Sequence, residues 1–261
     1  MSALTDRFDA VCERLEKALS RSGRDRENLE LVAVSKTHGA ASVAELCVHW
    51  QTTGKGRALF GESYTGEAGE KIARVERLLT GTPAAASMPQ TRPPVWHFVG
   101  HVQSRKSREV IGQFELIHSL DSVRLAEALQ KAWETKKSEA LAKSAPPMPP
   151  QNVLVQVNVG REAQKHGIAP EGLEDLLNAA RALPGIRVRG LMCLPPLAGT
   201  GEDSRPYFIM LRTLRDKMEK LCALPLPHLS MGMSGDFETA AEEGATLLRI
   251  GTDIFGTRDR T

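Results

Sequence analysis

The sequence predicts an α/β fold in which eight parallel strands alternate with helices and close into a (β/α)8 barrel. Short apolar runs rich in β-branched residues, typical of strands buried on both faces, alternate with stretches of helical periodicity. Eight such runs within 261 residues match the size of a barrel. On this count alone, a doubly wound open sheet is the structural alternative.

The expected elements follow one another along the whole chain. An amphipathic helix over residues 4–20 comes first, with apolar residues at helical spacing. The eight expected strands are 31–36, 58–60, 95–99, 116–119, 153–158, 188–192, 228–230 and 246–250. The expected helices between them are centred on 43–50, 66–79, 122–141, 171–182, 204–222 and 236–243. Residues 104–112 are too short and polar a stretch for a prediction.

Two proline-rich segments, 80–94 and 144–150, interrupt this pattern. The alternation of strands and helices continues through both, so we interpret them as surface loops rather than domain boundaries. We therefore expect one domain over residues 1–261, with the helix and connector of residues 1–28 packed outside the barrel.

Composition limits the partners and the compartment. Lys and Arg total 34 and Asp and Glu total 32, so a net charge of +2 gives no electrostatic support for a nucleic-acid or membrane partner. The 4 cysteines are scattered without a CxxC pair, which suits a reducing compartment. The first twenty residues are too charged for a signal peptide, and no apolar stretch is long enough to span a membrane. We expect a cytoplasmic protein.

Lys36 stands at the carboxyl end of the first expected strand. The simplest interpretation is a strand-terminal lysine that reaches solvent. In a (β/α)8 barrel, however, the carboxyl ends of the strands form the mouth in which active sites lie. A lysine held there by apolar neighbours loses its proton more easily and can form a Schiff base with a carbonyl compound.

Two segments near the end of the chain are candidates for a phosphate site. Residues 230–236 (SMGMSGD) follow the seventh expected strand and open a helix, and residues 249–252 (RIGT) follow the eighth. Loops seven and eight are the usual phosphate site of such barrels, although Ser234 could instead be a plain helix N-cap. Together with Lys36, the two segments indicate a pocket for a phosphorylated aldehyde such as pyridoxal 5′-phosphate.

The sequence also resembles a known family. The segments that carry the resemblance are LVAVSKT (31–37), FGESY (60–64), WHFVGHVQSRK (96–106), QVNVGREAQKHG (156–167), LSMGMSGDFETA (229–240) and GATLLRIGTDIFGTR (244–258). In order and spacing they are similar to the YggS/PROSC family of pyridoxal phosphate-binding proteins, which are implicated in vitamin B6 homeostasis. The resemblance runs from about residue 5 to residue 258. It implies a single barrel of the type found in the N-terminal domain of alanine racemase, with pyridoxal 5′-phosphate as cofactor.

The resemblance also implies roles for individual residues. Lys36 would carry the cofactor as a covalent aldimine, and Arg249 would face the pyridine nitrogen. The remaining cofactor-binding residues are Ser234, Gly251 and Thr252 at the phosphate, Met233 packed near the cofactor, and Ser63.

This chain departs from the family pattern at two places. Ser63 replaces an asparagine that is usual in the family, so its contact loses the reach of an amide. Leu194, Pro195 and Pro196 stand where small and polar residues are more usual.

The resemblance implies no metal. His97 and His101 are four residues apart, but Gly100 breaks the strand between them. We interpret His97 as a pocket or core histidine.

Two observations favour a carrier of the cofactor over an enzyme. An arginine at the pyridine nitrogen leaves that nitrogen unprotonated, which weakens the ring as an electron sink. The chain ends soon after its eighth strand, and its two tyrosines do not clearly supply the second acid/base of an alanine racemase. We therefore expect a non-catalytic protein that buffers pyridoxal phosphate or delivers it to apo-enzymes, as a monomer or weak homodimer. The alternatives are a pyridoxal phosphate-dependent racemase or related enzyme, and an aldolase-type barrel acting on a sugar phosphate.

Overall fold

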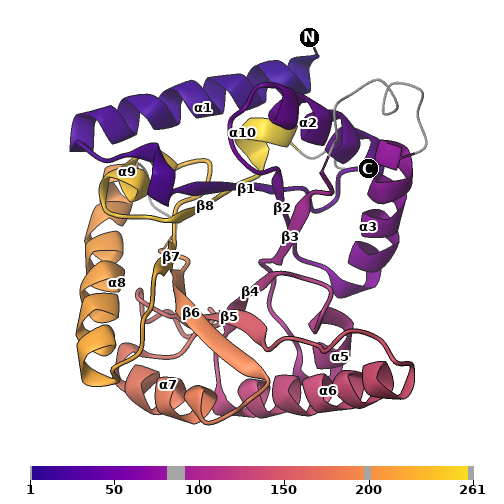
Figure 1. The fold of residues 1–261 in the computed structure, drawn as a ribbon. Coiled ribbons are helices and arrows are strands. Elements are labelled where there is room, and N and C mark those ends of the chain that lie inside the picture. The colour runs from indigo at the N-terminus through magenta and orange to yellow at the C-terminus, as the bar shows by residue number, and fades with distance from the viewer. Residues whose placement is uncertain (1, 81–91, 197–200, 258–261) are drawn as a thin grey trace.

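A computed structural model describes residues 2–80, 92–196 and 201–257 of the chain. Its eight parallel strands form a closed barrel in sequence order, and the last strand pairs with the first (Figure 1). The strands are β1 (Glu30–Val34), β2 (Leu59–Glu62), β3 (Val95–Phe98), β4 (Leu116–Leu120), β5 (Gln151–Val157), β6 (Ile186–Cys193), β7 (His228–Ser230) and β8 (Leu247–Ile250). The closed sheet confirms the predicted barrel and excludes the doubly wound alternative.

The strands are apolar on both faces because each separates two cores. Inward-facing side chains such as Val32, Leu59 and Leu154 fill the interior of the barrel. Side chains of the opposite face, such as Leu31 and Ala33 in β1, pack against the surrounding helices. This arrangement explains the near-continuous apolar runs in the sequence, since neither face of a strand meets water.

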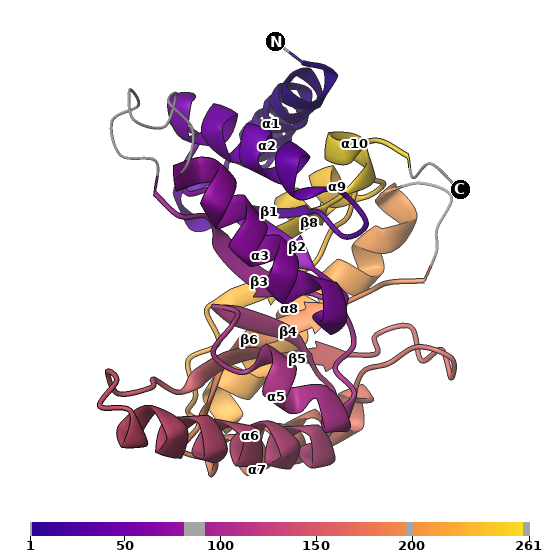
Figure 2. The ribbon, with the colours of Figure 1, turned by 90° about the vertical axis from the view of Figure 1, so that its right-hand side faces the viewer.

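The helices form the outer layer. They are α1 (Ala3–Ser22), α2 (Ala40–Thr52), α3 (Thr65–Thr80), α5 (Ser107–Val110), α6 (Val123–Ala142), α7 (Leu173–Arg181), α8 (Gly201–Leu221), α9 (Phe237–Glu242) and α10 (Thr252–Phe255). The described residues also form the short 3-10 helices η1 (Arg26–Asn28), η2 (Ser104–Lys106) and η3 (Pro170–Gly172). Figures 1 and 2 show α6 and α7 on the side of the barrel opposite α1 and α2. None of the helices in the described part of the chain is long and apolar enough to cross a membrane.

Helix α1 lies outside the barrel, along its β8–β1 side (Figure 1). The Arg7 Nε donates a hydrogen bond to the carbonyl oxygen of Ile254 at 2.8 Å. The guanidinium of Arg14 pairs with Glu238 at 2.9 Å and with Asp253 at 2.6 Å. These contacts attach α1 to α9 and α10, the two helices that flank the last strand.

The structure describes only part of the first proline-rich segment and all of the second. Residues 81–91, most of the first segment, lie outside the described residues. The second segment links α6 to β5 without regular structure over residues 145–150. It is held along α6 because Trp133 Nε1 donates to the Pro149 carbonyl oxygen at 2.9 Å. Residues 104–112, for which the sequence supported no prediction, contain η2 and α5.

Candidate functional site

The residues singled out in the sequence lie at the carboxyl ends of the strands. Because all eight strands run in parallel, these ends meet at one mouth of the barrel. In this mouth, Lys36 follows β1, Ser63 follows β2, Met233 and Ser234 follow β7, Arg249 lies in β8, and Gly251 and Thr252 follow β8.

Lys36 occupies a tight turn immediately after β1. The Ser35 N–H donates to the Gly61 carbonyl of β2 at 3.0 Å, and the His38 N–H donates back to the Ser35 carbonyl at 3.0 Å. Thr37 adopts a left-handed conformation with φ of 69°. The imidazole of His38 stacks on Phe255 of α10 with ring centroids 4.8 Å apart. The turn that carries the half-buried Lys36 is therefore attached to both β2 and α10.

A buried ion pair lies next to this turn, and the sequence analysis missed it. The fully buried carboxylate of Glu62 accepts hydrogen bonds from the Ser35 hydroxyl at 2.6 Å and from Lys71 Nζ at 2.8 Å. Lys71 also donates to the Ser35 carbonyl at 2.9 Å. In the sequence, Lys71 stands in an amphipathic helical stretch, where a lysine usually lies on the solvated face. The pairing ties α3 to the turn and engages the Lys71 ammonium.

The candidate phosphate residues come together through two close contacts. The Ser234 hydroxyl accepts a hydrogen bond from the Asp253 N–H at 3.2 Å, in the first turn of α10. Gly251 lies beside β1, where a Cβ on the glycine would be 3.4 Å from the Val34 carbonyl oxygen. Ser234, Gly251 and Thr252 therefore surround the start of α10, close to the strand that leads to Lys36.

The segment after β7 differs in one detail from the expectation. It does not open directly into a helix at Ser234, because α9 begins at Phe237 with Asp236 as its N-cap residue. The Asp236 carboxylate instead accepts the Met233 N–H at 2.7 Å, which closes a turn on Met233 and Ser234. Ser234 thus caps α10 rather than the helix that follows it. Met233 is exposed in this turn, whereas Met231 is buried.

Arg249 is a buried cation without a carboxylate partner among the described residues. Its side chain is fully enclosed, and burial lowers its pKa from the ordinary value. Nη1 donates to the Ser230 hydroxyl at 2.5 Å and Nη2 donates to the Cys193 carbonyl oxygen at 2.9 Å. Both acceptors are neutral, and a guanidinium carries five N–H donors. Arg249 therefore has donor capacity left for a further neutral acceptor.

Two buried histidines extend from Arg249 through the interior of the barrel. His118 Nδ1 lies 2.8 Å from the Ser230 hydroxyl, and His118 Nε2 lies 3.0 Å from His97 Nδ1. His97 Nε2 is 4.0 Å from the Glu115 carboxylate, which is too long for a hydrogen bond. Burial lowers the pKa of both histidines, so both rings are neutral near pH 7. Arg249 is thus positioned by a chain of buried polar groups.

His97 is a buried, hydrogen-bonded core histidine, as the sequence analysis expected, but its partner His118, which in turn bonds to Ser230, was missed. The signal available was the two-residue alternation of β4, which places His118 on the same inward face as Leu116. The identity of its hydrogen-bond partners depends on the closure of the barrel and could not be read from that alternation.

The two positions at which the chain departs from the family pattern each pack against a neighbouring loop. Gly100 packs against the backbone of Ser63, since a Cβ on the glycine would lie 2.2 Å from the Ser63 carbonyl oxygen. The Ser63 hydroxyl makes no hydrogen bond to a described residue. After β6, the Pro195 carbonyl oxygen accepts a hydrogen bond from Lys165 Nζ at 2.8 Å. Pro196 covers Gly160 in the same neighbouring loop.

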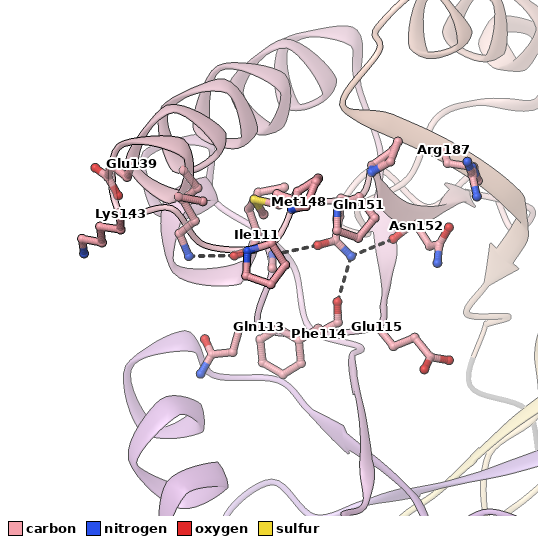
Figure 3. Close-up of a pocket in the computed structure, with 17 residues that line it drawn as sticks. Ile111, Gln113, Phe114, Glu115, Glu139, Lys143, Met148, Gln151, Asn152 and Arg187 are labelled. Atoms are coloured by element: carbon pink, nitrogen blue, oxygen red, sulfur yellow. Dashed lines mark hydrogen bonds between the residues drawn. The ribbon is translucent and has the colours of Figure 1, made fainter.

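A cavity of about 710 Å³ lies away from this mouth (Figure 3). Its lining residues include Phe114, Glu115, Met148 and Gln151, which stand at the amino-terminal ends of β4 and β5 and beside α6. Gln151 donates to the Phe114 carbonyl oxygen at 2.9 Å, so its amide is already engaged in the fold. None of the sequence-predicted site residues lines this cavity, and we do not assign the site to it.

Comparisons with known proteins identify the family to which the chain belongs. The family described as "Alanine racemase, N-terminal domain" matches residues 7–259. A protein of Aquifex aeolicus named "Pyridoxal phosphate homeostasis protein" is 38% identical over 255 residues, which cover 97% of each chain. A protein of the same name from Pseudomonas aeruginosa is 37% identical over 259 residues, or 99% of this chain and 97% of that one.

Solved structures show the same fold. PipY of Synechococcus elongatus, solved with pyridoxal phosphate bound, is 31% identical to this chain with a TM-score of 0.69. The match covers 93% of this chain and 100% of PipY. Alanine racemase from Corynebacterium glutamicum is 15% identical with a TM-score of 0.60, and the match covers 62% of that enzyme. The racemase likeness shows the barrel alone. The chain therefore belongs to the pyridoxal phosphate homeostasis proteins, a family built on the alanine racemase N-terminal domain.

Proposed function

We propose that this protein binds pyridoxal 5′-phosphate in the mouth of its barrel and holds it for delivery to apo-enzymes. One observation carries the proposal. The turn that contains Lys36, the buried Arg249 and the contact between Ser234 and α10 all lie at the same mouth of the barrel. The solved structure of PipY with pyridoxal phosphate bound supports this choice of ligand. We place the protein in the cytoplasm because its four cysteines are all free and buried.

The chemistry of these residues fits the cofactor. Lys36 supplies an amine, the group with which an aldehyde combines reversibly. Arg249 has unused N–H donors and no carboxylate partner in the described residues, which suits a neutral acceptor such as a pyridine nitrogen. Ser234 and the backbone at Gly251 and Thr252 supply a hydroxyl and N–H groups for a phosphate dianion.

Two arguments support a carrier over an enzyme, the first of which rests on the proposed position of Arg249 at the pyridine nitrogen. A guanidinium at the pyridine nitrogen leaves that nitrogen unprotonated, so the ring withdraws electrons weakly and stabilises a carbanion poorly. The relatives named as homeostasis proteins match along 97% of their own length, whereas the alanine racemase shares only the barrel. The racemase reaction is the competing proposal.

The carrier proposal predicts no turnover of amino acids at an enzymatic rate. The loaded protein, incubated in deuterium oxide with a panel of L- and D-amino acids, is expected to exchange their α-hydrogens far more slowly than about 1 per second. The readout is mass spectrometry for exchange and chiral chromatography for racemization. In parallel, the loaded protein should restore activity to an apo-enzyme. Exchange or racemization near ordinary enzyme rates would replace the carrier by the racemase.

The phosphate assignment predicts that Ser234→Ala weakens binding of pyridoxal phosphate roughly tenfold, because one hydrogen bond to a charged group is lost. Binding is measured by equilibrium titration at fixed salt. Thr213→Ala is the matched control, since among the described residues this exposed hydroxyl on α8 bonds only to the Ile209 carbonyl of its own helix. Unchanged affinity in both Ser234→Ala and Thr252→Ala would place the phosphate elsewhere.

A further inference from the structure

Three metal-ligating side chains meet at the mouth of the barrel, apart from the residues assigned to pyridoxal phosphate. His101 follows β3, Asp121 follows β4, and His166 lies in the loop after β5. Their ligand atoms all lie within 4.8 Å of one another. No other group of three His, Cys, Asp or Glu side chains within the described residues is placed in this way.

The distances within this triad are close to those of a coordination site. His101 Nδ1 is 3.3 Å from an oxygen of Asp121, and the rings of His101 and His166 stack with centroids 3.6 Å apart and planes 7° from parallel. A tetrahedral zinc ion with bonds of about 2.0–2.1 Å holds neighbouring donor atoms about 3.3 Å apart. A nitrogen lone pair lies in the plane of its ring, so coordination of one ion by both imidazoles requires the exposed His166 ring to turn out of this stack.

Hydrogen bonds hold the three residues in place. The Ser122 hydroxyl donates to the other Asp121 oxygen at 3.0 Å, which leaves the first oxygen facing His101. Gln156 Nε2 donates to the His166 carbonyl oxygen at 2.9 Å. The Ser119 hydroxyl donates to the carbonyl oxygen of Gly100, the residue before His101, at 2.5 Å. The bond to Asp121 is of the kind that orients a metal ligand, and the other two hold the backbone at His166 and next to His101.

We propose that His101, Asp121 and His166 bind a divalent transition metal ion such as Zn²⁺. Two imidazoles and one carboxylate are a donor set that such ions favour, and three protein ligands leave a coordination position open to water or to an anionic group. The competing interpretation is an ion pair between His101 and Asp121 with His166 stacked on His101, and the titration below distinguishes it from a metal site. In the sequence, His101 stands close to His97. Only the folded chain brings His101 to Asp121 and His166.

Titration of Zn²⁺ into the full-length, tag-free protein tests the proposal, with a chromophoric chelator as competitor and no pyridoxal phosphate present. We expect one Zn²⁺ per chain and at least a tenfold loss of affinity in each of His101→Ala, Asp121→Asn and His166→Ala. His49→Ala is the matched control, because His49 pairs with Asp9 at 3.0 Å but has no second histidine beside it. Circular dichroism of each variant verifies the fold.

Substitution of Co²⁺ for Zn²⁺ identifies the donor atoms. We expect visible bands of a nitrogen and oxygen site without the thiolate charge-transfer absorption that binding at one of the four cysteines would produce. Zn²⁺ affinity that is unchanged in His101→Ala and His166→Ala, or a Co²⁺ spectrum with thiolate absorption, would overturn the proposal. Because the cofactor is absent throughout, failure here leaves the pyridoxal phosphate proposal untouched.

Discussion

Replacing Lys36 by alanine is expected to abolish covalent attachment of pyridoxal phosphate to this protein. Wild-type protein mixed with the cofactor should absorb visible light, and borohydride should fix the cofactor mass on the peptide that contains Lys36. Lys36→Ala should lose both signals and retain weaker, reversible binding through the contacts at Ser234 and Arg249. The physical reason is position, since the turn after β1 that carries Lys36 is attached to β2 and to α10 at the mouth of the barrel.

Lys71 makes the experiment discriminating, because it is a second amine close to the same turn. Its ammonium is held by the buried Glu62 carboxylate at 2.8 Å and by the Ser35 carbonyl at 2.9 Å. An amine must be free of such bonds to attack an aldehyde, and the contacts with Glu62 and Ser35 engage the Lys71 amine within the fold. Lys106→Ala removes a lysine on the surface and serves as the control for Lys36→Ala. Borohydride-fixed mass on Lys71 or Lys106 in the wild-type protein would contradict the assignment to Lys36.

The buried histidines predict a loss of stability in mild acid. Burial lowers the pKa of His118 well below its ordinary value of 6.5, so the unfolded chain takes up a proton that the folded protein resists. The free energy of unfolding therefore falls as the pH drops below about 6.5 and continues to fall until the lowered pKa is reached. Each such histidine contributes a slope of up to about 1.4 kcal/mol per pH unit in this window. His97 adds to the slope in the same direction, because burial lowers its pKa too.

Urea unfolding at pH 7.5, 6.5 and 5.5 measures this slope in the wild-type protein and in His118→Gln. The variant is expected to be less stable at pH 7.5, because Ser230 and His97 lose a partner, and to have a smaller slope below pH 6.5. His49→Gln is the control, since His49 lies on α2, outside the barrel interior. Equal slopes in the wild type and His118→Gln would show that His118 takes up its proton without cost in the folded state.

Local patterns in the sequence determined the order and type of the elements. The apolar run before Lys36 and the amphipathic residues of α1 were sufficient, because strand and helix periodicity reflects burial on two faces or on one. The same local patterns predicted that Lys36, Ser234 and Arg249 lie at the carboxyl ends of strands, where a parallel barrel forms its mouth. The sequence left open whether the sheet closes, because closure is a pairing of β1 with β8 across more than two hundred residues.

Only the tertiary structure decided which polar groups meet. Ser234 reaches α10 rather than α9, Arg249 joins Ser230 in the interior, and Lys71 enters a buried ion pair instead of facing solvent. His101, which the sequence set beside His97, instead meets Asp121 and His166. Each of these contacts joins residues from different elements of the fold. Their distances are set by the register and curvature of the closed barrel, which no local pattern of residues encodes.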